Sequence, residues 1–207
     1  MSRIGLIDYG MGNLHSVQRA FERLDAEVTL VHGPADLAAC SALVLPGVGA
    51  FDPAMAQLRS ADLVQPLQQW CAAGGALLGI CLGLQLLFEG SDEGDAPGLG
   101  ILAGRVRALP RRQGFPIPHM GWEPLQPAVP SPLLPDQAPE AWMYFVHSFA
   151  AVPADPACTT AQVSFAGDVI TAAVWQGSVG ACQFHPEKSG VSGEAMLRRW
   201  LNWLASL

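Results

Sequence analysis

The sequence has few charged residues, and basic residues are fewer than acidic ones. Charged residues make up 14% of the 207 positions, with 11 Lys and Arg against 18 Asp and Glu, and the formal net charge is −7. Surfaces that bind nucleic acid or anionic membranes carry clustered Lys and Arg. The composition therefore argues against both kinds of partner and leaves small molecules and proteins.

Long apolar runs and paired cysteines are also missing. No stretch approaches the roughly 18 uninterrupted apolar residues of a membrane-spanning helix, and the first residues lack the pattern of a secretory signal. The 5 cysteines are odd in number and form no CxxC pair, which argues against a zinc site. We therefore expect a soluble cytoplasmic protein with reduced thiols and no cofactor.

Apolar runs alternate with helical patterns in the first half of the chain. Half of all residues are hydrophobic, at 50%, which is ample for a buried core. Strands that are apolar throughout are typical of a parallel sheet covered by helices on both faces. The predicted strands are 3–8, 27–31, 42–46 and 76–80, and the predicted helices are 13–24, 62–74 and 82–89.

The second half of the chain differs from the first in its proline content and in its strand pattern. Residues 110–139 hold nine of the 17 prolines, which favours loops or short edge strands, because proline has no N–H to donate. Four more strands follow, and then a closing helix at 192–207. We predict one α/β domain over residues 1–207, with a central mostly parallel sheet flanked by helices and an antiparallel or mixed section in the second half. The four later strands are 142–148, 161–165, 170–176 and 179–185.

The segment GICLG, residues 79–83, places Cys81 between two glycines, after an apolar strand and before a helical pattern. A nucleophile on a sharp strand-to-helix turn needs small neighbours of this kind. The start of the following helix would lower the pKa of the thiol and supply N–H groups for an oxyanion. Simple burial of a cysteine is the alternative, and it is the reading we adopt for the other four thiols.

The segment QFHPEKS, residues 183–189, offers a base and an orienting group for that thiol. His185 and Glu187 lie two residues apart in a segment that Pro186 keeps out of the helical region. In an extended chain both side chains point to the same side, so the carboxylate can fix the imidazole tautomer. Alternatively, the segment is a surface turn.

A second glycine loop, PGVGAF at residues 46–51, follows the strand at 42–46. Ligands bind at strand ends of parallel sheets, and glycines allow a close backbone approach and a peptide flip. A plain turn is the alternative. The loop is no phosphate-binding motif, since GxxxxGK[ST] and a GxGxxG after a strand are both absent.

The three segments in this order resemble the class I glutamine amidotransferases, over nearly the whole chain. Three further segments look like the glutaminase subunits of imidazole glycerol phosphate synthase within that family: IDYGMGNLHSV at 7–17, PHMGW at 118–122 and YFVHS at 144–148. The resemblance departs at Leu84, where methionine is usual, and at Glu123, where asparagine is common.

The resemblance implies a reaction and a set of site residues. Cys81 would attack the side-chain amide of L-glutamine, with His185 as acid and base and Glu187 as its orienting group. The oxyanion would meet the N–H of Leu82 and one from the loop Gly47, Val48 and Gly49, and a misoriented Val48 peptide would leave the enzyme nearly idle. The matched substrate positions are Gln85, Glu93, Ser148 and Phe149.

The resemblance also implies a partner, because ammonia released into water is protonated and lost. In the family, ammonia passes to a (β/α)₈-barrel cyclase subunit that makes imidazole glycerol phosphate and AICAR in histidine biosynthesis, so a heterodimer is expected. Asn13, Trp122 and Lys188 match interface positions. On the residues alone, Gln85 and Glu93 could instead be solvated, and Trp122 could belong to the core.

Three other functions remain open. The chain could be a catalytically silent binding partner, although Cys81, His185 and Glu187 are all present. It could be a cysteine peptidase or stress-response protein of similar sheet topology, which fits HPE and PHMGW poorly. It could also be the glutaminase of another synthase, against which PGVG and PHMGW argue.

Overall fold

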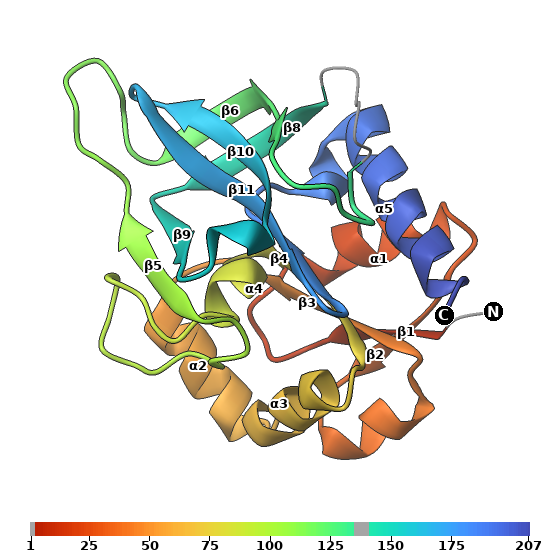
Figure 1. Ribbon diagram of the computed structural model, residues 1–207. Coiled ribbons are helices and arrows are strands. Elements are labelled where there is room, and N and C mark those ends of the chain that lie inside the picture. The colour runs from red at the N-terminus through yellow and green to blue at the C-terminus, as the bar shows by residue number, and fades with distance from the viewer. Residues whose placement is uncertain (1–2, 135–140) are drawn as a thin grey trace.

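The computed structural model describes residues 3–134 and 141–207, and its centre is an eight-stranded sheet (Figure 1). The strand order is β2-β1-β3-β4-β12-β11-β10-β7. Neighbours from β2 to β12 pair in parallel, and those from β12 to β7 pair antiparallel. This confirms the predicted α/β class. The strands are β1 Arg3–Ile7, β2 Glu27–Val31, β3 Ala42–Gly47, β4 Ala76–Cys81, β7 Gln126–Pro127, β10 Thr159–Phe165, β11 Asp168–Gln176 and β12 Val179–Cys182.

Each parallel strand feeds two hydrophobic cores, one on each face of the sheet. In β3, Ala42 and Val44 point into one core, whereas Leu43 and Leu45 point into the other. Alternate residues of a strand face opposite sides, so burial on both faces requires the continuous apolar run that the sequence shows. No helix of the described residues is long and apolar enough to cross a membrane.

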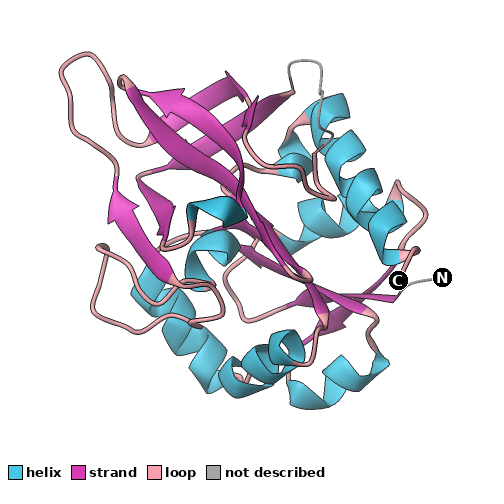
Figure 2. Cartoon of the chain, in the orientation of Figure 1, coloured by secondary structure: helices cyan, strands magenta, loops and turns pink. Residues whose placement is uncertain are grey.

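Helices cover both faces of this sheet (Figure 2). Helices α1 and α5 pack into one core with Phe21 and Trp200, whose rings meet edge to face at 5.7 Å, while α2, α3 and α4 pack against the other face. The bounds are α1 Leu14–Glu22, α2 Phe51–Ser60, α3 Val64–Ala72, α4 Leu82–Leu86 and α5 Gly190–Leu204, and the 3-10 turns are η1 Pro34–Ala39, η2 Pro156–Cys158 and η3 Pro186–Lys188.

Some expectations about the helices need correction. Helix α2 was not predicted, because the segment after the strand at 42–46 was interpreted only as a glycine loop. Its Pro53 lies in the first turn, where no intrahelical N–H bond is required. Helix α4 ends at Leu86 and not at residue 89. Helix α3 spans Val64–Ala72 and not residues 62–74; Leu67 is buried, and Trp70 and Cys71 pack half-buried against the same core.

The proline-rich region forms edge structure, as the sequence indicated. Two small antiparallel sheets stand beside the main one: β5 (Gly104–Ala108) pairs with β9 (Phe149–Pro153), and β6 (His119–Pro124) pairs with β8 (Trp142–His147). Part of the predicted loop region, residues 135–140, lies outside the described residues. These two sheets rise above the carboxyl ends of the parallel strands (Figure 1).

The topology explains why distant segments meet. Strands β4 and β12 are parallel neighbours, with Ile80 opposite Cys182. Their carboxyl ends therefore lie side by side, and the segments that leave them begin at Cys81 and at Gln183. Carboxyl ends of adjacent parallel strands are the usual place for a ligand site in an open α/β sheet.

Candidate active site

Cys81 lies at the corner between β4 and α4 in a strained backbone conformation. Its φ is 56° and its ψ is −111°, a region that non-glycine residues rarely adopt. The corner is tight enough that a Cβ at Gly83 would overlap the carbonyl oxygen of Leu45, and one at Gly79 would lie 3.0 Å from the Gly83 oxygen. The glycines flanking Cys81 are therefore required by backbone packing, as the sequence pattern indicated.

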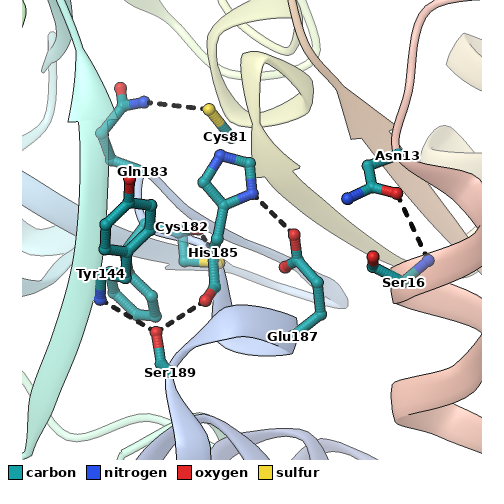
Figure 3. Close-up of polar contacts among 10 residues, drawn as sticks. Asn13, Ser16, Cys81, Tyr144, Cys182, Gln183, His185, Glu187 and Ser189 are labelled. Atoms are coloured by element: carbon teal, nitrogen blue, oxygen red, sulfur yellow. Dashed lines mark hydrogen bonds and ion pairs between the residues drawn. The ribbon is translucent and has the colours of Figure 1, made fainter. Parts of the chain in front are cut away.

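His185 and Glu187 form a buried pair beside this thiol. The imidazole lies between the Cys81 sulfur and the Glu187 carboxylate (Figure 3), and its Nδ1 is 2.7 Å from Glu187 Oε1. The two side chains are only 3% and 1% exposed. The second carboxylate oxygen, Oε2, is also buried and has no hydrogen-bond partner among the described residues. His185 is therefore the side chain that this carboxylate binds.

The local backbone that brings this pair together differs from the prediction. His185 is extended, but Glu187 belongs to the 3-10 turn η3, so the two side chains do not meet through the two-residue alternation of a strand. Ser189 anchors the turn, since its hydroxyl donates to the His185 carbonyl at 2.6 Å and accepts from the Tyr144 N–H at 2.9 Å. The pairing was predicted, and its stated cause was wrong.

The environment of His185 favours the imidazolium. Burial alone would lower the pKa of His185, but hydrogen bonds with Cys81 and Glu187 raise it more, to about 9. Opposite or accepting partners stabilise the charged form in this way. At neutral pH the histidine therefore holds a proton that it can deliver to a leaving amine.

This pKa predicts a basic limit to activity. A reaction that needs this proton should slow as pH rises through about 9, where the imidazolium is lost. The folded pKa lies above the ordinary 6.5, so the associated stability is full below pH 6.5 and disappears as pH rises through about 9. The measurement is kcat against pH. Glu187→Gln removes one of the groups that raise the pKa, so its basic limb should move to lower pH; an unmoved limb would contradict the assignment.

A cavity of about 240 Å³ opens over the thiol. It collects most of the predicted site residues from five separate segments, which is the arrangement expected of a small-molecule site. Gly47 does not line it; that residue packs beneath the loop, where a Cβ would meet the Tyr9 hydroxyl at 2.6 Å. The lining residues are Val48, Gly49, Cys81, Leu82, Gln85, Glu93, Pro118, Val146, His147, Ser148, Phe149 and His185.

Gln85 and Glu93 have defined contacts at this cavity. Gln85 is buried, and its Nε2 donates to the Phe149 carbonyl at 3.1 Å and to Gln183 Oε1 at 3.0 Å. Both amide hydrogens are engaged, so the carbonyl oxygen of Gln85 is the atom that can accept from a ligand. Glu93 is exposed, but its Oε2 accepts from the Phe51 N–H at 2.8 Å and so caps helix α2. Neither residue is merely solvated.

The Val48 peptide is turned away from the thiol. Its N–H donates to the Met11 carbonyl at 3.3 Å. Nearby, the Tyr9 hydroxyl donates to the Pro46 carbonyl at 2.9 Å. The turn at residues 9–11 therefore holds the glycine loop at two points, and the loop N–H cannot serve an oxyanion until the contact with Met11 breaks.

The predicted partner-binding residues lie at the surface around this site. Trp122 is 49% exposed and stands on the outer face of β6, not in the core. Lys188 is exposed in η3, directly after Glu187. Asn13 caps α1, where its side chain accepts from the Ser16 N–H at 3.4 Å, as the sequence indicated.

Sequence reasoning assigned no role to several residues that the fold brings to the site. Gln183 Nε2 lies 3.9 Å from the Cys81 sulfur, although its segment had been singled out for His185. His147 lines the cavity, and Tyr9 holds the glycine loop. All three stand inside motifs that were noticed, so the available signal was proximity in sequence to the motif residues.

Comparisons with known proteins agree with this geometry. A family model described as glutamine amidotransferase class-I matches residues 5–203. The chain belongs to this family. Among curated relatives, this amidotransferase is 61% identical over 204 residues to "Imidazole glycerol phosphate synthase subunit HisH 2" of Prochlorococcus marinus (strain MIT 9313), covering 99% of this chain and 96% of the relative. It is 59% identical to subunit HisH of Synechococcus sp. (strain CC9605), covering 97% and 94%.

Solved structures confirm the fold of this amidotransferase. PurLQS from Thermotoga maritima superimposes with a TM-score of 0.78 at 20% identity, covering 99% of this chain and 100% of the other. A structure titled "Crystal structure of glutamine amidotransferase" gives 0.76 at 20% identity, with 99% of each chain covered. The predicted family, fold class and enzymatic nature are confirmed.

Proposed function

We propose that this amidotransferase is the glutaminase subunit of imidazole glycerol phosphate synthase, which hydrolyses L-glutamine to glutamate and ammonia. The observation that carries the proposal is the placement of one imidazole between the Cys81 sulfur and the Glu187 carboxylate at the floor of the 240 Å³ cavity. The HisH relatives support the choice of synthase. Residues 1–207 would act as one glutamine amidotransferase domain, and the family match over 5–203 supports this.

The chemistry follows from the three side chains. The Cys81 thiolate attacks the amide carbon of glutamine, while the proton that left the thiol resides on His185. As the tetrahedral intermediate collapses, His185 delivers this proton to the departing nitrogen and ammonia leaves. A water molecule then attacks the thioester, with His185 now as the base, and glutamate is released. Glu187 fixes the tautomer of His185 throughout.

Two backbone donors would hold the oxyanion. The Leu82 N–H lies in the first turn of α4, where it has no intrahelical acceptor. The Val48 N–H would be the second, but it is bonded to Met11 at rest. One such donor contributes about 3 kcal/mol of barrier lowering. The resting chain is therefore expected to hydrolyse glutamine slowly until the Val48 peptide turns.

The cavity lining suits the polar head and amide of glutamine. Gln85 offers a carbonyl oxygen, Glu93 offers a carboxylate at the rim, and Ser148 and Phe149 provide the backbone strip for the α-substituents. The Ser148 carbonyl accepts from the Leu109 N–H at 2.9 Å, which uses one of its two lone pairs. The second lone pair and the Ser148 hydroxyl are available to a ligand.

The ammonia is proposed to pass to a (β/α)₈ cyclase subunit that makes imidazole glycerol phosphate and AICAR in the cytoplasm. An exposed apolar face supports such a docking partner, since aromatic side chains are enriched at interface hot spots. On the outer face of the β6–β8 sheet, Met120 is 61%, Trp122 49% and Trp142 46% exposed. Asn13 and Lys188 would extend the interface.

The direct test is co-purification with the candidate cyclase, followed by a glutaminase assay with its ribonucleotide present. We expect a heterodimer, slow hydrolysis by the isolated chain and faster hydrolysis in the complex. Turnover of casein-like substrates without glutamine would instead indicate a peptidase. Capture of a different synthase subunit would reject the partner while leaving the glutaminase chemistry in place.

Trp122→Ala should weaken that complex by about tenfold or more, because an interface tryptophan often contributes upward of about 2 kcal/mol. Affinity can be measured by titration calorimetry. Leu30→Ala, at a 37% exposed apolar residue on the distant edge strand β2, is the control and should bind normally. Equal affinities of the two variants would place the interface elsewhere.

A further inference from the structure

Two buried histidines outside the catalytic pair face each other across the β6–β8 sheet. His119 and His147 are opposite in the strand register, and each is 5% exposed. His119 Nδ1 lies 3.1 Å from His147 Nε2, and the His119 ring stacks on Phe145 at 5.5 Å. Burying two imidazoles is unfavourable unless their nitrogens are hydrogen bonded. The acceptor of each N–H therefore shows which nitrogen carries the proton.

The backbone decides the tautomer of His147. Its Nδ1 lies 2.8 Å from the carbonyl oxygen of Phe149, and a carbonyl oxygen only accepts, so Nδ1 carries the proton. Burial lowers the pKa of His147 to about 4, against the opposing effect of this hydrogen bond. The ring is therefore neutral at pH 7, and its Nε2 is an acceptor. His119 must then donate from Nδ1.

Glu123 faces the other nitrogen of His119. Its Oε1 lies 3.4 Å from His119 Nε2, and its side chain is 37% exposed. Glu123 therefore lies beside the nitrogen of His119 that His147 does not use. The donors run in one direction, from His119 Nδ1 to His147 and from His147 Nδ1 to the Phe149 carbonyl.

The far end of this chain is the glutamine cavity. The Phe149 carbonyl that accepts from His147 also accepts from Gln85 Nε2 at 3.1 Å. Gln85 in turn contacts Gln183, whose Nε2 is 3.9 Å from the Cys81 sulfur. One backbone oxygen is thus shared between the histidine pair and the side chains that surround the thiol.

We propose that His119 and His147 are positioning residues that hold the Phe149 carbonyl, and through it Gln85, in the geometry that receives glutamine. Glu123 lies against the other nitrogen of His119, at the outer end of this chain. The inference rests on the proposed glutaminase function of the same cavity.

Nitrogen-15 NMR of the imidazole rings at pH 7 tests the proton positions. In the wild-type chain, His147 should be neutral with its proton on Nδ1, which donates to the Phe149 carbonyl, and His119 should carry a proton on the Nδ1 that faces His147. A wild-type His147 protonated on Nε2, or a His119 without a proton on Nδ1, would overturn the proposal.

Steady-state kinetics of the complex tests the positioning role. His119→Phe keeps a ring stacked on Phe145 but cannot donate to His147. We expect the KM for glutamine to rise about tenfold, which is the scale of one hydrogen bond. The kcat should be nearly unchanged, because the backbone strip at Ser148 and Phe149 contacts glutamine equally in the ground state and the transition state. An unaltered KM in His119→Phe would reduce the pair to a purely structural element.

Control measurements distinguish a failure of the positioning proposal from a failure of the proposed function. His32→Phe, at an exposed histidine outside the cavity, should leave the KM unchanged. If His119→Phe does not fold, the positions of the Nδ1 protons in the wild type still decide, because they are measured without any substitution. If the wild-type complex does not hydrolyse glutamine, the proposed function fails, whereas the proton positions are still measured.

Discussion

Replacing Cys81 by alanine should abolish glutamine hydrolysis. Removal of a nucleophile lowers kcat on the order of 10⁶-fold, to background, because no covalent intermediate can form. Hydrolysis is measured as glutamate release, and labelling by a glutamine-analogue electrophile should disappear as well. The variant should still bind the cyclase, since Cys81 is 8% exposed and lies at the floor of the cavity.

Cys71→Ala is the matched control for this substitution. Burial raises the pKa of the Cys71 thiol to about 12, so this sulfur stays protonated and unreactive at neutral pH. Its replacement should leave hydrolysis and labelling intact. Full activity in Cys81→Ala would remove the thiol from the mechanism, whatever its position beside His185.

Gly83→Ala should disrupt the corner that presents the thiol. The added methyl group would overlap the Leu45 carbonyl oxygen. A backbone atom of a buried strand cannot move aside as the end of a flexible side chain can. Overpacking of this kind lowers the free energy of unfolding by about 3 kcal/mol or more. The measurement is denaturant unfolding, and kcat should fall with it as Cys81 moves.

Gly33→Ala gives the comparison at a glycine without crowding. Its φ is −166°, which any residue adopts, and no atom lies within 4 Å of an added Cβ. The free energy of unfolding should hardly change. If Gly83→Ala unfolded at the same denaturant concentration as the wild type, the tight approach of the corner to Leu45 would be refuted as a requirement.

The parts of the fold that could be predicted from the sequence are those set by local pattern. Strands β1, β3 and β4 are apolar because they are buried on both faces, and that burial shows in consecutive residues of the sequence. The corner at Cys81 needs small neighbours within two positions. Helix α2 was not predicted, because the glycine loop drew the interpretation of this segment, although Pro53 in the first turn is compatible with a helix.

Other features depend on pairings that no local pattern encodes. Glu187 reaches His185 through a 3-10 turn anchored by Ser189, not through strand alternation. The Phe51 N–H finds its cap at Glu93, 42 positions away. The same limit applies to the Val48 peptide, whose resting direction depends on the Met11 carbonyl.

By itself, the sequence determined the class of fold and the identity of the thiol, the imidazole and the carboxylate, because each is marked by short-range spacing and backbone constraints. Only the tertiary structure decided how these groups meet, which way the glycine loop faces, and that His147 and Gln85 share the Phe149 carbonyl. Those contacts join strands far apart in the chain, and hydrogen bonds between such strands acquire direction and distance only once the sheets have formed.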